Sequence, residues 1–335
     1  MMQPALRRGL GLSALGLLAI MVMWLRYLID RDPHGAAVSL APPPPGVALF
    51  RLTAIAVAVI AGSSLAISGV LLQALLRNPL ASPFILGISA GAGLGVMIAI
   101  SLTYDADAVA RPASSSHGPA ALLGALAVLG IVYLLGQRRG WLDPVSLVLV
   151  GVIVSAICGA LIMLLHHLGP TTGLMQGKIT RWMMGRIPEY PEPITLIAAG
   201  GLAVVGGAAG MVMGRAMDAA TLSDDEARSV GLALGRLRVG LFILAGALTA
   251  GAVALCGPIG FVGLIAPHAA RLLVGPRHTL LVPAAALVGI VIMVGADAGR
   301  QAIELGAGRL PIGVLTALIG GPAFIWLLRT GRGQA

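Results

Sequence analysis

The densest cluster of charged residues in the sequence lies between residues 221 and 238, where six charged side chains interrupt a largely apolar chain. Ser223 and Glu226 have the spacing of a capping box, in which a hydroxyl and a carboxylate bind the free amide groups at a helix start. The polar residues and the glycine that follow suit short helices exposed to water, joined by a left-handed turn. The segment serves either as a solvated loop or as a rigid surface for another protein. Its candidate residues are Ser223, Asp224, Asp225, Glu226, Arg228 and Gly231.

Catalytic chemistry has little support in the sequence. It contains no HExxH zinc motif, no P-loop, no GxSxG nucleophile elbow and no GxGxxG after a strand. His166 and His167 are adjacent, so they cannot share one face of a helix, and a two-histidine metal site is not expected. We therefore expect no catalytic residue, no metal site and no covalently bound cofactor, and we interpret the chain as a protein other than an enzyme.

Asp297 is the acidic residue most clearly placed within an apolar run, and ionisable residues in such positions are candidates for function. Arg300 follows three positions later, so an ion pair near a helix end is the alternative to proton coupling. A carrier driven by protons or sodium would be expected to have more acidic residues near the middle of its helices. This lowers the expectation of ion-driven transport.

The composition indicates a membrane protein. Hydrophobic residues make up 58% of the 335 residues, the mean hydropathy is +0.96, and ordinary domains contain roughly 45–50% apolar residues. A helix needs about 20 apolar residues to cross a bilayer, and helices satisfy their own backbone groups there. The net charge of +9 comes from arginines scattered over loop ends, which favours membrane topology over nucleic-acid binding. The fold class is therefore an all-α polytopic membrane protein.

Ten apolar runs predict ten transmembrane helices in a single domain of residues 1–335, with the charged loop at residues 215–238. An even number of crossings places both termini on one side. With that side in the cytoplasm, thirteen of the 22 lysines and arginines lie on cytoplasmic ends. The predicted runs are residues 9–29, 50–76, 83–102, 119–136, 142–168, 194–214, 237–256, 259–273, 280–303 and 310–328.

Several long motifs resemble one transporter family. Residues 73–83 read QALLRNPLASP, residues 257–268 read GPIGFVGLIAPH, and residues 310–314 read LPIGV. Together with Ala296-Asp297 and the EARSVG of the charged loop, they are similar to FecCD-type permeases. These are the membrane subunits of type II ABC importers for ferric siderophores, haem and vitamin B12. The resemblance covers roughly residues 50–330.

The resemblance implies a type II importer architecture with ten helices, a homodimer, two cytoplasmic ATPase subunits that use ATP, and a periplasmic substrate-binding protein. It implies a bacterial inner membrane, with lipid around the helices and no nucleic acid as a partner. It assigns the charged loop to ATPase coupling. It implies that Arg51 and Arg300 dock the binding protein. We propose Arg309 for the same role, because Ala54 stands here at the position where the family usually has a second arginine. Candidate residues of the translocation pathway are Arg181, Trp182, Met183, Met184 and His167.

Two questions stay open at this point. A secondary carrier or exporter of a similar bulky ligand, working without an ATPase, is the alternative to an importer subunit. An iron chelate, haem and a corrinoid are all compatible substrates, because the outer basic residues and the histidines suit several anionic ligands.

Overall fold

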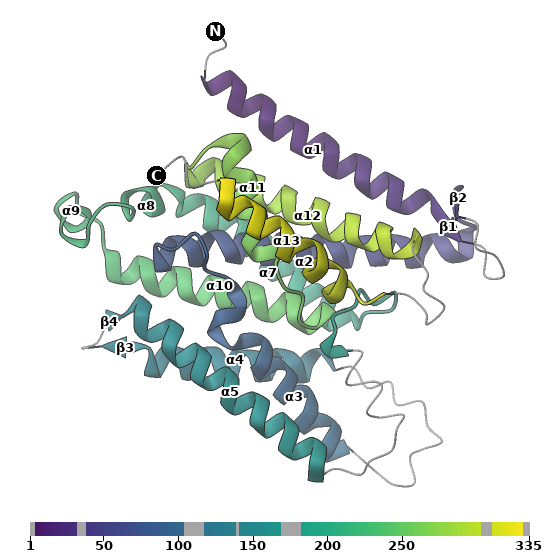
Figure 1. Ribbon diagram of the computed structural model, residues 1–335, viewed down its shortest axis with the longest axis horizontal. Helices are drawn as coiled ribbons and strands as arrows, with labels where there is room; N and C mark the ends of the chain where they lie inside the picture. The colour runs from purple at the N-terminus through teal and green to yellow at the C-terminus, as the bar shows by residue number, and fades with distance from the viewer. Residues whose placement is uncertain are drawn as a thin grey trace.

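The computed structural model describes residues 4–31, 38–103, 117–138, 141–168, 182–302 and 310–330, and most of these are helical (Figure 1). The longer helices are α1 (Pro4–Leu28), α2 (Pro45–Leu76), α3 (Ile88–Thr103), α4 (Gly118–Leu135), α5 (Pro144–Leu168), α7 (Pro193–Val212), α10 (Leu234–Cys256), α11 (Val262–Val274), α12 (His278–Ala302) and α13 (Ile312–Thr330). The short elements are η1 (Pro83–Leu86), α8 (Gly214–Ala219), α9 (Asp224–Ser229), and the hairpins β1–β2 (Ile29–Arg31, Val38–Leu40) and β3–β4 (Gln137–Arg138, Trp141–Leu142).

Each predicted apolar run coincides with one longer helix, which confirms the all-α membrane fold. Within the described residues, seven helices are long and apolar enough to cross a bilayer, namely α1, α2, α4, α5, α7, α10 and α12. Three shorter apolar helices, α3, α11 and α13, account for the other runs. The length of α11 reflects its boundaries, because positive φ angles at Phe261 (68°) and Gly275 (86°) interrupt the helical path on both sides.

Helices α2 and α10 form the centre of the bundle. In α2, 78% of the most apolar window is buried, against 11% in α1, which lies along the outside (Figure 1). Helix α2 packs most extensively against α12 and α10. Polar groups in this core are paired: the Ser68 hydroxyl donates to the Ala245 carbonyl at 2.8 Å and lies 2.8 Å from the Thr249 hydroxyl. A buried hydroxyl without such a partner would destabilise the core.

Two glycine pairs let the backbone of α2 touch its neighbours. A Cβ atom added to Gly69 would lie 1.9 Å from the carbonyl oxygen of Gly263 in α11, and one added to Gly62 would lie 2.4 Å from that of Gly289 in α12. No side chain fits at either distance. Close approach through small residues is the usual way that helices associate in lipid, where apolar burial drives association weakly.

The two ends of the bundle differ in the elements they carry. Helices α8 and α9 and the β3–β4 hairpin lie at one end, together with the start of α1 and the end of α13, whereas β1–β2 lies at the other (Figure 1). The first and last helices therefore reach the end that carries the charged loop, as the even number of crossings predicts. Which side of the membrane this end faces remains a prediction.

Candidate functional site

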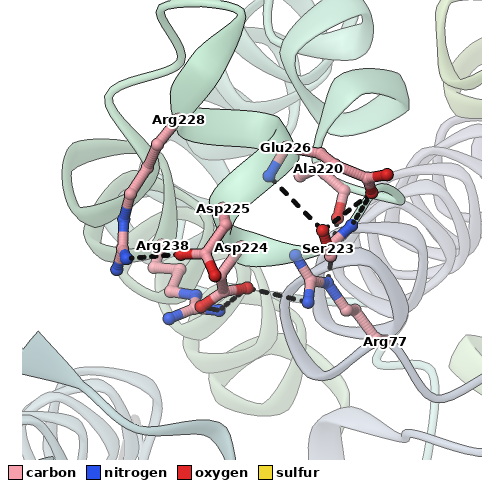
Figure 2. Close-up of polar contacts among 8 residues, drawn as sticks. All are labelled: Arg77, Ala220, Ser223, Asp224, Asp225, Glu226, Arg228 and Arg238. Atoms are coloured by element: carbon pink, nitrogen blue, oxygen red, sulfur yellow. Dashed lines mark hydrogen bonds and ion pairs between the residues drawn. The ribbon is translucent and has the colours of Figure 1, made fainter.

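The capping box predicted at residues 223–226 is present and starts α9. The backbone N–H of Ser223 donates to Glu226 Oε2 at 3.0 Å, and the backbone N–H of Glu226 donates to Ser223 Oγ at 3.3 Å. The Ser223 hydroxyl also donates to Glu226 Oε2 at 2.7 Å. These bonds satisfy amide groups that a six-residue helix could not pair internally. Figure 2 shows the arrangement.

Asp224 joins α9 to two long helices (Figure 2). Its carboxylate lies 2.8 Å from a terminal nitrogen of Arg77, the residue that ends α2. It also accepts two bonds from Arg238 of α10, at 2.9 and 3.0 Å. Arg77 adopts a left-handed conformation (φ 46°) and donates its Nε to the Ala220 carbonyl at 2.9 Å. The QALLRNPLASP segment (residues 73–83) and the charged loop, which are far apart in the sequence, are therefore joined in the structure.

These contacts set the charge state of the two acidic residues. Partial burial raises the pKa of Asp224, but the guanidinium groups of Arg238 and Arg77 outweigh this effect and hold the pKa below its ordinary value. The Ser223 hydroxyl and backbone amide lower the pKa of Glu226. Both carboxylates are therefore ionised at neutral pH, and α9 starts with the negative charge that its dipole favours.

The outward side of α9 is exposed, while its inward side is anchored. Ala227 is fully buried, whereas Asp225 and Arg228 are exposed and lie 3.5 Å apart. Leu222 and Val230 flank α9 and expose 42% and 65% of their surface. We call α9 with Leu222 and Val230 the coupling surface. Mixed charged and apolar exposure on a fixed element is typical of a surface that binds another protein.

Helix α8 is tied to the start of α12. The Asp218 carboxylate accepts the backbone N–H of His278 at 2.9 Å, and its Oδ1 lies 2.6 Å from His278 Nδ1. Gly231, with φ 83°, makes the left-handed turn that the sequence predicts after α9. The charged loop is therefore held in place by contacts with α2, α10 and α12. This favours a rigid surface over a freely solvated loop.

At the opposite end of α10, residues 182–187 form a turn in contact with two of the sequence motifs. The Arg186 amide donates to the Cys256 carbonyl at 2.7 Å, and the Ile312 amide donates to the Gly185 carbonyl at 3.2 Å. Trp182 is buried, whereas Met183 and Met184 are exposed. The turn thus presents two thioethers between the ends of α10 and α13, and polarisable thioethers suit contact with varied ligands. A pathway role for these residues stays a prediction.

The arginines predicted to dock a binding protein have internal partners. Arg51 lies 2.5 Å from Asp30 and donates to the Tyr27 carbonyl at 3.0 Å. Arg300 donates to Asp297 at 2.6 Å. Both arginines are buried in the single chain, so neither presents a free guanidinium for docking. Their role in docking therefore stays a prediction, and their burial argues against it.

The i, i+3 ion pair predicted for Asp297 and Arg300 is confirmed, but the sequence analysis missed a third member. Arg26 of α1 also donates to Asp297, which is 0% exposed. The fully buried carboxylate thus lies between two guanidinium groups from different helices, as a buried charge requires. In the sequence, the position of Arg26 in the last turn of an apolar helix was the signal that could have indicated a partner for a buried carboxylate.

Three other predicted residues remain to be placed. Arg181 and Arg309 lie outside the described residues, and His167 is exposed in the last turn of α5.

The chain is similar to several transport proteins. It is 35% identical to the hemin transport system permease protein HmuU of Yersinia pestis, over 85% of this chain and 83% of that protein. It is 37% identical to the cobalamin import system permease protein BtuC of Halobacterium salinarum, over 84% and 73%. A structure described as an inward-facing metal-chelate type ABC transporter aligns with a TM-score of 0.82 and 29% identity, covering 96% of this chain and 99% of that one. The profile of the FecCD transport family matches residues 45–330, and the chain therefore belongs to the FecCD transport family.

Proposed function

We propose that this chain is the permease subunit of an ABC importer that moves an iron chelate, such as a ferric siderophore or haem, or a corrinoid across the inner membrane. Family membership and the names of the relatives support the transport class, since those relatives handle hemin, cobalamin and ferric citrate. The chain supplies the membrane path. Separate ATPase subunits hydrolyse ATP, and a periplasmic protein delivers the substrate.

The coupling surface is the observation that carries this proposal. Asp224 is held by Arg77 of α2 and Arg238 of α10, so a force applied to α9 reaches two long helices directly. A partner that moves α9 would therefore move the centre of the bundle, which is what an external ATPase must achieve. The exposed Asp225 and Arg228 offer charged contacts to that partner. In the functional assembly, two copies of this chain form a homodimer, and both termini lie in the cytoplasm.

Reconstitution with and without an ATPase tests the function. The permease is co-expressed with a candidate ATPase subunit, purified and placed in proteoliposomes containing a candidate binding protein and a ferric siderophore, haem or cobalamin. We expect uptake of one ligand only when the ATPase and ATP are both present. Equal uptake without the ATPase would instead identify a secondary carrier.

A charge-reversal variant locates the docking surface. Arg228→Glu should remain folded, because Arg228 is exposed, but should lose co-purification of the ATPase. Arg186→Glu is the matched control, since Arg186 is exposed at the opposite end of α10 and should retain the ATPase. Retention of the ATPase by Arg228→Glu would exclude Arg228 from the contact.

A further inference from the structure

A cavity of about 280 Å³ lies at the end of the bundle opposite the coupling surface. It is bounded by the end of α1, the β1 strand, the start of α2 and the end of α12, with one residue from the segment before α7. Its wall consists of Arg26, Ile29, Asp30, Val47, Phe50, Arg51, Glu189 and Gln301. Ligand pockets are commonly around 300 Å³ or larger, so this space suits a small polar group rather than a whole siderophore.

Buried hydrogen-bond donors line the cavity. Arg26 is 3% exposed, and its contact with Asp297 among the described residues uses only Nε. Arg26 also lines the cavity, so its guanidinium can reach a group inside it. Buried donors of this kind destabilise a protein unless water or a ligand accepts their bonds. A phosphate is the acceptor that a guanidinium binds best, through two parallel bonds.

The charges of the wall balance. Two guanidinium groups, from Arg26 and Arg51, face the same space as two carboxylates, from Asp30 and Glu189. A purely anionic ligand would meet both carboxylates at a cost in free energy. A ligand with a phosphate and an ammonium group can satisfy the arginines and also donate N–H bonds to a carboxylate. Carboxylates accept several hydrogen bonds, so their existing contacts leave room for another donor.

The surroundings place the cavity at the depth of lipid headgroups. The rings of Trp24 and Tyr27 stack at 5.8 Å in the last turns of α1, and Tyr190 contacts Phe50 with ring centres 4.4 Å apart. Tryptophan and tyrosine concentrate at membrane–water interfaces. Beside the cavity, Leu49 and Leu52 on the outer side of α2 are exposed, as lipid-facing residues are.

From these observations we propose that the cavity binds the headgroup of a phosphatidylethanolamine lipid. The phosphate binds Arg26, the ammonium donates to Glu189 or Asp30, and the acyl chains lie along α1 and α2. The lipid would occupy the seam between α1, which precedes the family match, and the rest of the bundle. The proposal does not depend on the substrate that the transporter carries.

Lipid retention tests the site. The full-length protein is purified from nanodiscs with equal amounts of phosphatidylethanolamine, phosphatidylcholine and phosphatidylglycerol, and bound lipids are counted by native mass spectrometry. We expect phosphatidylethanolamine to exceed each of the others roughly tenfold, the ratio that one hydrogen bond to a charged group supplies. Phosphatidylcholine is the most informative competitor of phosphatidylethanolamine, because its quaternary ammonium has no N–H to donate to a carboxylate. Glu189→Gln should shift retention toward phosphatidylglycerol, since it removes one negative charge.

A cavity-filling variant provides the control. Val47→Trp should abolish preferential retention, whereas Val145→Trp should leave it unchanged, because both valines are exposed but only Val47 lines the cavity. Retention of the three lipids in bulk proportion by the unaltered protein would overturn the proposal, as would unchanged selectivity in Val47→Trp. Binding of soluble glycerophosphoethanolamine as tight as that of the lipid would overturn the assignment to a lipid.

Discussion

The guanidinium of Arg77, at the end of α2, lies 2.8 Å from the carboxylate of Asp224, at the start of α9. This contact joins the most buried spanning helix to the coupling surface. Because Arg238 of α10 binds the same carboxylate, Asp224 holds the ends of two core helices together.

Removing the Asp224 charge should impair coupling more than folding. Each side chain of the Arg77–Asp224 pair is about one third exposed, and exposed ion pairs contribute only about 0.2–1 kcal/mol to stability. Residues in coupling networks change coupling by about 0.5–2 kcal/mol, which corresponds to roughly 2- to 30-fold. We expect Asp224→Asn to fold normally and to lower uptake per ATP hydrolysed. Glu192→Gln, just before α7 at the opposite end of the bundle, is the control that should retain the ratio.

The link through Asp224 should be insensitive to pH in the physiological range. Its folded pKa lies below the ordinary value of 3.8, so its contribution is fully present above that value and is lost as pH falls through the folded pKa. Uptake and ATPase retention that depend on this carboxylate should therefore be constant from about pH 5 to 8. A loss between these limits that disappears in Asp224→Asn would contradict the assigned charge state.

Loss of the capping hydroxyl should loosen α9 locally. Ser223→Ala removes the acceptor of the Glu226 amide, and such changes cost about 0.5–2 kcal/mol. Amide hydrogens of residues 224–229 should exchange faster by the corresponding factor, while those of α10 keep their rates. Ser229 ends α9 and donates its hydroxyl to the Glu226 carbonyl, so Ser229→Ala leaves the capping bonds in place and should have little effect on the amides of the first turn. Equal exchange in the two variants would argue against the capping role.

Asp297 should be important for stability. Removing one partner of a buried ion pair costs about 3–5 kcal/mol, and Asp297→Asn would leave Arg26 and Arg300 buried without a counter-charge. The thermal midpoint in detergent should fall markedly. Asp30→Asn should cost less, because Asp30 is 39% exposed. Combining Asp297→Asn with Arg26→Met should restore part of the loss, and an additive effect of the two changes would indicate that the residues are not coupled.

Cysteine labelling tests the orientation. Cys158 and Cys256 are first replaced, and single cysteines are placed at Ser39 or Ser223, which are exposed at opposite ends of the bundle. An impermeant thiol reagent applied to intact cells should label position 39 and leave position 223 unmodified until the membrane is opened. The opposite pattern would reverse the proposed topology.

Much of the fold follows from the sequence, because apolar runs of sufficient length have few alternatives in lipid. The capping box at Ser223 and Glu226 and the ion pair of Asp297 with Arg300 were predictable for the same reason, since both are interactions within one helix. Contacts between distant segments were not. Nothing in the spacing of Arg77 and Asp224, or of Arg26 and Asp297, indicates that the pairs meet, because helix packing decides it.

The prediction of docking by Arg51 and Arg300 illustrates the same limit. A sequence shows that an arginine lies near a helix end, but its exposure depends on carboxylates contributed by other segments. Here Asp30 and Asp297 occupy both side chains.

The short helix α11 has a consequence for biosynthesis. Its 13 residues extend about 20 Å, whereas the hydrocarbon layer is about 30 Å thick. The remaining depth is crossed by irregular backbone around Gly257 and Gly275, which lipid does not tolerate but a protein interior does. Such a segment cannot partition into the bilayer alone. Helix α2 is already made when α11 is synthesised, but α12, the other neighbour that encloses α11, follows it in the chain, so α11 and α12 must enter the membrane together.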